Sequence, residues 1–265
     1  MNLSLDWRLG TVGFGYKDWV GPFYPTGAKP ATYLNTYAQS FNAVELDTTF
    51  YGPPDADKVR RWANTVPVNF IFCPKTPRRI THDLRLTGPA LIEMHAFLSA
   101  IREFEHRLGP ILIQFPPDFS PAESATLSDF LRRLPAGLRY AIEFRHRAWY
   151  DGPAQNLLPA FNIAWVTADY PTTPRVLTHT ADFLYLRFLG EHGKYQIKTH
   201  EREDRTADLQ FWWQQLQPAL PHVTHVYGFF NNDYSGFSPA TCNRFKQLVG
   251  LPTTNIQPGQ QLSLF

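Results

Sequence analysis

Short apolar runs alternate with segments of helical periodicity along most of the chain. The runs have the length of buried strands, which is about 4–8 residues. They cover residues 9–13, 43–49, 69–74, 110–115, 140–144, 163–168, 183–188 and 223–230. Because strands that alternate with helices form parallel sheets with right-handed crossovers, this order predicts an α/β protein.

Apolar side chains recur at helical spacing between these runs. Leu127, Phe130 and Leu134 share one stripe, and Ser120 with Glu123 forms a capping box before it. Further helices are predicted near 34–41, 55–65, 89–108, 154–161 and 209–216, and from 238 onward. Residues 170–182 show no helical period, so we expect an irregular crossover after the sixth strand.

The repeated strand–helix unit predicts a single-domain TIM (β/α)8 barrel over residues 1–251. An open doubly wound sheet is the structural alternative, but no G-x-G-x-x-G or P-loop sequence follows any of the runs. Residues 252–265 are rich in Pro, Gly, Asn, Thr and Gln and are expected to form a flexible tail.

Composition narrows the class of protein. Apolar residues make up 43% and charged residues 18%, which excludes a disordered chain. The net charge of +2 argues against nucleic-acid binding by bulk charge. Two cysteines, Cys73 and Cys242, exclude a disulfide framework and fit a reducing cytosol. With no secretory signal and no membrane-spanning stretch visible, we expect a soluble, cytoplasmic protein with no membrane partner.

Polar side chains gather where the predicted strands end, and in such barrels the active site lies at these carboxyl ends. Side chains alternate across a strand, so residues two apart share a face. The pairs expected to share the inner face are Glu45 and Asp47, Glu143 and Arg145, and Tyr185 and Arg187. The neighbours expected to face the helices are Val44, Leu46, Ile142, Phe144, Leu184 and Leu186.

This arrangement predicts an enzyme that binds an anionic, phosphate-containing ligand or a nucleic-acid strand. The candidate catalytic residues are Glu45, Glu143, His146 and Asp169, with either glutamate as general acid or base and the other two as orienting groups. The candidate substrate-binding residues are Tyr16, Trp19, Lys75, His82, Gln114, Arg145, Tyr185, Arg187, Asn231 and Asn232. The three cations Lys75, Arg145 and Arg187 would hold the ligand's charge, and the aromatic loop 14–24 would stack on a base or sugar ring.

Other interpretations of the same residues remain open. The strand-end charges can be buried ion pairs, and the aromatic loop can be a small satellite core. A hydrolytic reaction follows only from analogy with other barrels. The alternatives are a non-catalytic binding or adaptor protein, and a glycosidase in which Glu45 and Glu143 flank one bond at about 5–9.5 Å. No cofactor is predicted. No H-x-H or H-E-x-x-H spacing occurs, so a divalent metal on strand-end carboxylates and histidines is a minor alternative.

Several motifs resemble those of the domain of unknown function 72 (YecE-like) family. They are GFGYKDW at 13–19, VELDTTFY at 44–51, ITH at 80–82, GPILIQFPP at 109–117, AIEFRH at 141–146 and FNND at 230–233. The resemblance spans nearly the whole chain and implies a TIM-barrel fold. It implies no established activity, since the family is named for lacking one. Where many members have Asn, this chain has Asp47, which adds charge to the expected cleft.

The last five residues, Gln261-Leu262-Ser263-Leu264-Phe265, resemble the peptide by which bacterial proteins bind the sliding clamp. Leu262, Leu264 and Phe265 would fill apolar pockets, and the Gln261 amide would set the register. This interpretation makes the clamp a partner and places the protein near DNA replication or repair. The alternative is that the tail packs on its own barrel and covers apolar surface.

Overall fold

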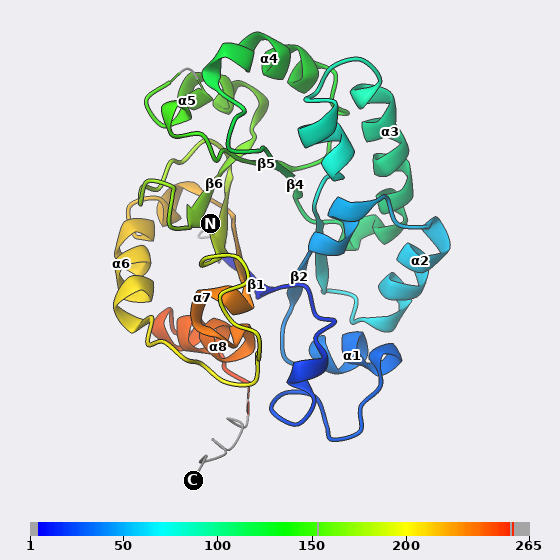
Figure 1. The fold of residues 1–265 in the computed structure, drawn as a ribbon, viewed down its shortest axis with the longest axis vertical. Coiled ribbons are helices and arrows are strands. Elements are labelled where there is room, and N and C mark those ends of the chain that lie inside the picture. The colour runs from blue at the N-terminus through cyan, green and yellow to red at the C-terminus, as the bar shows by residue number, and fades with distance from the viewer. Residues whose placement is uncertain (1–4, 153, 255, 257–265) are drawn as a thin grey trace.

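The computed structural model describes residues 5–152, 154–254 and 256. Within them, eight parallel strands form one sheet in the order β3-β2-β1-β8-β7-β6-β5-β4. The edge strands β3 and β4 meet through isolated bridges, Phe72 with Leu108 and Lys75 with Leu112, instead of a full ladder. The sheet is therefore a nearly closed barrel surrounded by helices, as the sequence predicts (Figure 1).

The strands are β1 (Asp6–Val12), β2 (Ala43–Leu46), β3 (Ile71–Pro74), β4 (Ile111–Gln114), β5 (Tyr140–Glu143), β6 (Ala164–Asp169), β7 (Phe183–Phe188) and β8 (His225–Phe230). The α-helices are α1 (Pro30–Tyr37), α2 (Ala56–Thr65), α3 (Ala90–Ile101), α4 (Ser124–Arg132), α5 (Ala154–Leu157), α6 (Thr206–Leu216), α7 (Asn232–Ser235) and α8 (Ser238–Leu248). Figure 1 shows the long helices forming an outer ring around the strands.

The boundaries differ from the sequence prediction at a few places. The second strand ends at Leu46, because residues 47–51 turn into a 3₁₀ helix above it. The α-helix predicted over 89–108 ends at Ile101, where the chain tightens into 3₁₀ geometry over Arg102–Arg107, and Glu105 with φ of 53° breaks that second segment. The short helix α7 was not predicted from the sequence. Between β6 and β7 no helix forms, as expected.

Two separate apolar layers show the predicted alternation along the strands. Val44, Ile142 and Leu184 belong to the larger core between the barrel and its helices, as do Leu46, Phe144 and Leu186. The smaller core lies inside the barrel and includes Ala43, Ala141, Phe183 and Tyr185. The assignment of these six apolar side chains to the helix-facing side is therefore confirmed.

The aromatic loop after β1 forms a packed core of its own. Trp19 is fully buried, and its Nε1 donates a hydrogen bond to Asn232 Oδ1 at 3.2 Å. Tyr24 stacks on Tyr33 with ring centroids 4.3 Å apart. Tyr16 is half-buried, and its hydroxyl donates to the Val12 carbonyl at 2.8 Å. Tyr16 and Tyr24 also pack on the Trp19 ring, with centroids 4.7 Å and 5.8 Å away, so this buried ring has no free face for a ligand.

No helix among the described residues combines the length and the apolar character needed to cross a bilayer.

Candidate functional site

A buried charge cluster lies inside the barrel at the upper ends of β2, β5 and β7. Arg187 Nη2 donates to Glu45 Oε1 at 2.6 Å, and Arg187 Nε donates to Glu45 Oε2 at 2.9 Å. Arg187 Nη1 also donates to Glu143, whose other oxygen accepts from Arg145 Nε. The Tyr185 hydroxyl donates to Glu45 Oε2 at 2.9 Å. Both glutamates are fully buried, so the cluster is an internal ion-pair network.

Electrostatics in this network keep Glu143 ionised. Burial alone would raise the pKa of Glu143, but Arg145 and Arg187 outweigh it and lower that pKa to about 2. Burial likewise opposes the charge on Arg187, and Glu143 with Glu45 raises the pKa of its guanidinium. A carboxyl with a pKa this low cannot serve as a general acid near neutrality.

The structure also bears on the two glutamates as a glycosidase pair. Glu45 and Glu143 bind the same guanidinium and have no exposed surface. A glycosidase needs its two carboxyl groups on either side of the bond that is cleaved. Neither side chain faces a space that a sugar could enter, so this alternative has no geometric support.

Above Arg187 the barrel opens into a cavity of about 350 Å³ at the carboxyl ends of the strands. We call this cavity the barrel mouth. Its polar lining consists of Asp47, Lys75, Gln114, Arg145, Arg187, His192, Asn231 and Asp233. Its aromatic lining consists of Phe50, Tyr51 and Tyr170. The structure thus brings Lys75, Gln114, Arg145, Arg187 and Asn231 together, as the sequence predicts for a shared site.

Lys75 follows β3 directly and is half-buried in the barrel mouth. Its Nζ lies 3.9 Å from the centroid of the Phe50 ring. Within the described part of the chain, Nζ makes no hydrogen bond and no ion pair. Burial, reinforced by the positive charge of Arg187, lowers the pKa of Lys75 to about 8. The amine can therefore lose its proton at mildly alkaline pH.

Arg145 presents a fixed guanidinium to the same cavity. Its Nε donates to Glu143, and its guanidinium carbon lies 3.9 Å from the centroid of the Tyr170 ring. The side chain is 13% exposed. Neither of its Nη atoms donates to another of the residues that the structure describes. Arg145 is thus held on one edge and one face, and its remaining donors are free to bind a ligand.

Two carboxylates of the mouth were not among the candidates chosen from the sequence. Asp47 makes no ion pair with the described residues, and burial together with the negative charge of Glu45 raises its pKa. Asp233 is 4% exposed; its Oδ2 accepts from the Gly193 amide at 2.8 Å, while its buried Oδ1 has no partner among the described residues. The alternation of the second strand already places Asp47 on the inner face, and the polar end of β8 was the signal that could have identified Asp233.

Other candidates lie outside the cavity. Asp169 faces the helices, where its Oδ2 accepts from Trp212 Nε1 at 2.8 Å and from the Tyr234 hydroxyl at 2.7 Å. His146 Nδ1 accepts from the Ala148 amide at 3.2 Å and caps a 3₁₀ turn. The structure therefore does not place Asp169 and His146 where they could orient a ligand in the mouth. Both instead stabilise connections outside the barrel.

The remaining candidates are also held by internal contacts. Asn232 is buried, and its Oδ1 accepts from the amide and hydroxyl of Ser238 as well as from Trp19. His82 packs edge-on against Phe50 with ring centroids 5.1 Å apart, and burial together with Lys75 lowers its pKa to about 4. The imidazole of His82 is thus neutral at physiological pH. Tyr185 belongs to the core inside the barrel.

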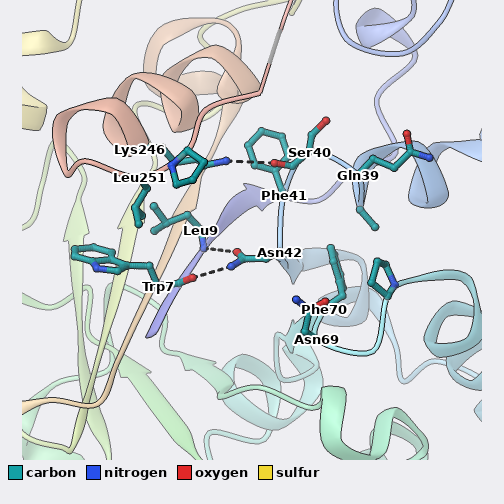
Figure 2. Close-up of a pocket in the computed structure, with 13 residues that line it drawn as sticks. Trp7, Leu9, Gln39, Ser40, Phe41, Asn42, Asn69, Phe70, Lys246 and Leu251 are labelled. Atoms are coloured by element: carbon teal, nitrogen blue, oxygen red, sulfur yellow. Dashed lines mark hydrogen bonds between the residues drawn. The ribbon is translucent and has the colours of Figure 1, made fainter. Parts of the chain in front are cut away.

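A second cavity, of about 290 Å³, lies at the opposite, amino end of β1, β2 and β3 (Figure 2). Asn42 spans it, with its Oδ1 accepting from the Leu9 amide at 3.0 Å and its Nδ2 donating to the Trp7 carbonyl at 2.8 Å. Lys246 Nζ donates to the Ser40 carbonyl at 3.3 Å. Backbone groups thus hold both the Asn42 and the Lys246 side chains, and no acidic side chain of the described residues lines this cavity, in contrast to the barrel mouth.

No three His, Cys, Asp or Glu side chains of residues 5–152, 154–254 and 256 gather closely enough to hold a metal ion. The tail residues Gln261, Leu262, Leu264 and Phe265 lie outside the residues that the structure describes.

Comparison with known proteins shows similarity to proteins whose names state no activity. The family model "Protein of unknown function DUF72" matches residues 8–262. UPF0759 protein YecE of Escherichia coli is 36% identical over 121 residues, which are 45% of this chain and only 43% of YecE. UPF0759 protein YunF of Bacillus subtilis is 26% identical over 97% of this chain and 99% of its own length.

Solved structures agree on the fold. A DUF72 family protein from Thermotoga maritima is 27% identical, covers 92% of this chain and 99% of its own, and superposes with a TM-score of 0.76. A DUF72 family protein from Enterococcus faecalis has the same TM-score at 22% identity and covers 95% of this chain and 100% of its own. At that identity the second likeness supports the fold alone.

Proposed function

Because this chain belongs to the DUF72 family, whose description names no activity, we propose its function from the site itself. We propose that the barrel mouth binds a small phosphate-containing ligand and that Asp47 transfers a proton to or from it. Arg145 is the main anchor for the phosphate, and Lys75 adds positive charge when protonated.

The observation that carries the proposal is the guanidinium of Arg145, oriented by Glu143 and Tyr170 while its Nη donors are left free toward the cavity. A planar donor set that is fixed before the ligand arrives loses little entropy on binding an oxyanion. Arg187 is not assigned this role, because each of its three nitrogens already donates to Glu45 or Glu143, which neutralise its charge. Of the three expected cations, Arg145 and Lys75 therefore remain for the ligand.

The other groups of the mouth suit the rest of such a ligand. Asp47, Asn231 and Asp233 are oxygen-bearing side chains that can accept hydrogen bonds from ligand hydroxyls. A volume of about 350 Å³ is near the lower end of ordinary ligand pockets, about 300–1,000 Å³. This size favours a sugar phosphate or a mononucleotide over a nucleic-acid strand.

Proton transfer is assigned to Asp47 because of its environment. Hydrolysis, the reaction expected from the sequence, needs a carboxylate that is free to take a proton from water. Glu45 and Glu143 are held by Arg187, whereas Asp47 lies in the mouth without an ion pair to a described residue. Its raised pKa also brings it closer to neutral pH.

Removing the Arg145 anchor should weaken ligand binding selectively. In isothermal titration with ribose 5-phosphate, Arg145→Gln should lose roughly tenfold or more in affinity, since a charged hydrogen bond is worth about 1.5–3 kcal/mol. Unphosphorylated ribose serves as the ligand control. The matched protein control is Arg147→Gln, because Arg147 is exposed and does not line the mouth. Equal affinities of the two variants would contradict the assignment.

Anion binding should also depend on pH through Lys75. Lys75 is charged below its pKa of about 8 and neutral above it, so affinity for the phosphate should fall as pH rises through 8. Lys75→Arg should remove this fall, because an arginine stays charged across the range. Titrations from pH 6 to about 9.5, beyond the Lys75 pKa of about 8, would measure the effect. If the affinity of Lys75→Arg still falls with rising pH, another group causes the pH dependence.

We propose separately that the tail recruits the protein to the bacterial sliding clamp. The support is the sequence Gln261–Phe265 and the way the preceding segment is attached. Thr254 Oγ1 donates to the Ser40 carbonyl at 2.9 Å, and the Thr254 amide donates to Asn243 Oδ1 at 3.1 Å. These contacts hold the first residues of the tail to the barrel, ahead of Gln261–Phe265.

A peptide covering residues 258–265 should therefore bind the clamp with a Kd in roughly the micromolar range, since three apolar anchors gain about 1.5–3 kcal/mol each before the entropy of ordering is subtracted. Deleting Gln261–Phe265 should abolish binding of the full chain and leave its Tm unchanged. A peptide with the same composition in scrambled order is the control. A lower Tm of the truncated chain, together with no peptide binding, would instead support docking of the tail on its own barrel.

A further inference from the structure

We propose that Lys75 is a carbonyl-reactive amine that forms an imine with an aldehyde or keto group of the ligand in the barrel mouth. The inference rests on the proposed function, because Arg145 would hold the phosphate of the same ligand. It names the ligand class more closely: a small phosphorylated aldehyde or ketone.

The position of Lys75 meets the geometric needs of a nucleophile. The amine lines a cavity that opens to solvent, and no hydrogen bond or ion pair to a described residue occupies Nζ. The Phe50 ring, 3.9 Å away, covers one side of Nζ. Lys246, at the other end of the barrel, is a useful contrast, because its Nζ donates to the Ser40 carbonyl (Figure 2).

The surrounding charges favour the neutral amine that the reaction requires. Burial and Arg187 lower the pKa of Lys75 most, and Arg145 acts in the same direction. Charges that act the other way are those of Glu143, Glu45 and, when ionised, Asp47. With a pKa of about 8, about a tenth of the molecules carry a neutral Lys75 at pH 7, against about one in 2,500 for a lysine of ordinary pKa. Desolvation next to another cation is a known way to activate a lysine.

Asp47 supplies the proton that the reaction needs. The neutral Lys75 nitrogen attacks the carbonyl carbon and a C–N bond forms. The carbonyl oxygen takes up the proton that the nitrogen loses, which gives a neutral carbinolamine. A protonated Asp47 then gives its proton to the hydroxyl group and becomes the carboxylate, the C–O bond breaks, and water leaves; burial and the charge of Glu45 raise the pKa of Asp47. The products are an iminium on Lys75 and one water molecule. The iminium keeps a positive charge beside the anion, so the phosphate stays bound.

Reductive trapping tests the proposal on the full-length protein. The protein is incubated at pH 7 with glyceraldehyde 3-phosphate and sodium cyanoborohydride, which delivers hydride to the imine carbon and leaves a stable secondary amine. Intact mass and peptide mapping should then show one preferred adduct, on Lys75, with the mass of the aldehyde less one oxygen atom. Lys75→Arg should lack this adduct. Lys246→Arg, the matched control, should be labelled on Lys75 like the wild type.

The outcomes separate this inference from the proposed function. The inference is overturned if the label is spread over the surface lysines and Lys75 is no more modified than the rest. If ribose 5-phosphate still binds in the titration, the proposed function stands without the imine. A second outcome is that glyceraldehyde labels Lys75 as well as glyceraldehyde 3-phosphate does, and that inorganic phosphate gives no protection. This result would support the reactivity of the Lys75 amine and overturn the phosphate site. Faster labelling by the phosphorylated aldehyde, slowed by inorganic phosphate, would support both.

Discussion

Arg187→Met should lower the free energy of unfolding by about 3–5 kcal/mol, because it leaves buried carboxylates without their main partner. Glu45 would lose its only cation among the described residues, and Glu143 would keep Arg145 alone. Both glutamates are fully buried, so water cannot replace the lost guanidinium. Urea denaturation at neutral pH measures the change.

The triple variant Arg187→Met, Glu45→Gln, Glu143→Gln is the matched control, since it removes both unpaired charges. It should recover much of the lost stability, as neutral replacements of buried ion pairs often do. If Arg187→Met unfolds at the same urea concentration as the wild type, the network contributes nothing to the fold. Glu45, Glu143 and Arg187 would then again be candidate ligand-binding residues.

The same network should make the wild-type protein sensitive to acid. Glu143 has a pKa of about 2 in the folded protein, below its ordinary value of 4.5. A lowered folded pKa adds stability that is present above pH 4.5 and is lost as pH falls toward 2. In the triple variant this part of the acid dependence should disappear.

Gly190→Ala should be the most damaging small substitution in the barrel mouth. Gly190 has φ of +67°, and a Cβ built on it would lie 2.1 Å from the backbone carbonyl oxygen of Asp233. Neither strand end can move easily, because Phe188 on β7 pairs in register with Phe230 on β8 just below. Overpacking typically costs about 1–3 kcal/mol, and a left-handed backbone adds about 1–2 kcal/mol for alanine. We expect a loss of about 3 kcal/mol and weaker ribose 5-phosphate binding, since Asp233 must shift.

Gly193→Ala provides a close control for this substitution. Gly193 also has a positive φ, +76°, but a Cβ there meets no atom within 4 Å. Both alanines therefore strain the backbone, and only the one at position 190 collides with Asp233. The difference between their Tm values isolates the collision. Equal Tm values for the two variants would show that the contact between β7 and the end of β8 is free to relax.

Local patterns in the sequence were sufficient to predict the barrel and the two faces of its strands. The alternation places Val44 and Leu46 outside and Glu45 inside, and the structure agrees. This works because side chains on one side of a strand recur every two residues and those on one side of a helix every 3.6. Burial of one side therefore produces a periodic pattern of apolar residues in the sequence. The same method also failed locally: the apolar spacing predicts one helix to residue 108, but the α-helix ends at Ile101 and Glu105 breaks the 3₁₀ segment that follows.

Only the tertiary structure decided which inward-facing charges neutralise one another and which stay free. Arg187 lies 142 positions from Glu45 and 44 from Glu143, and no local pattern links residues so far apart. Once Arg187 is paired with both, Arg145, Lys75, Asp47 and Asp233 are charged groups of the mouth that keep atoms without a partner among the described residues. The sequence determines the fold and the inner face because those depend on short-range periodicity, whereas charge pairing and pKa values depend on distances that arise only when the barrel closes.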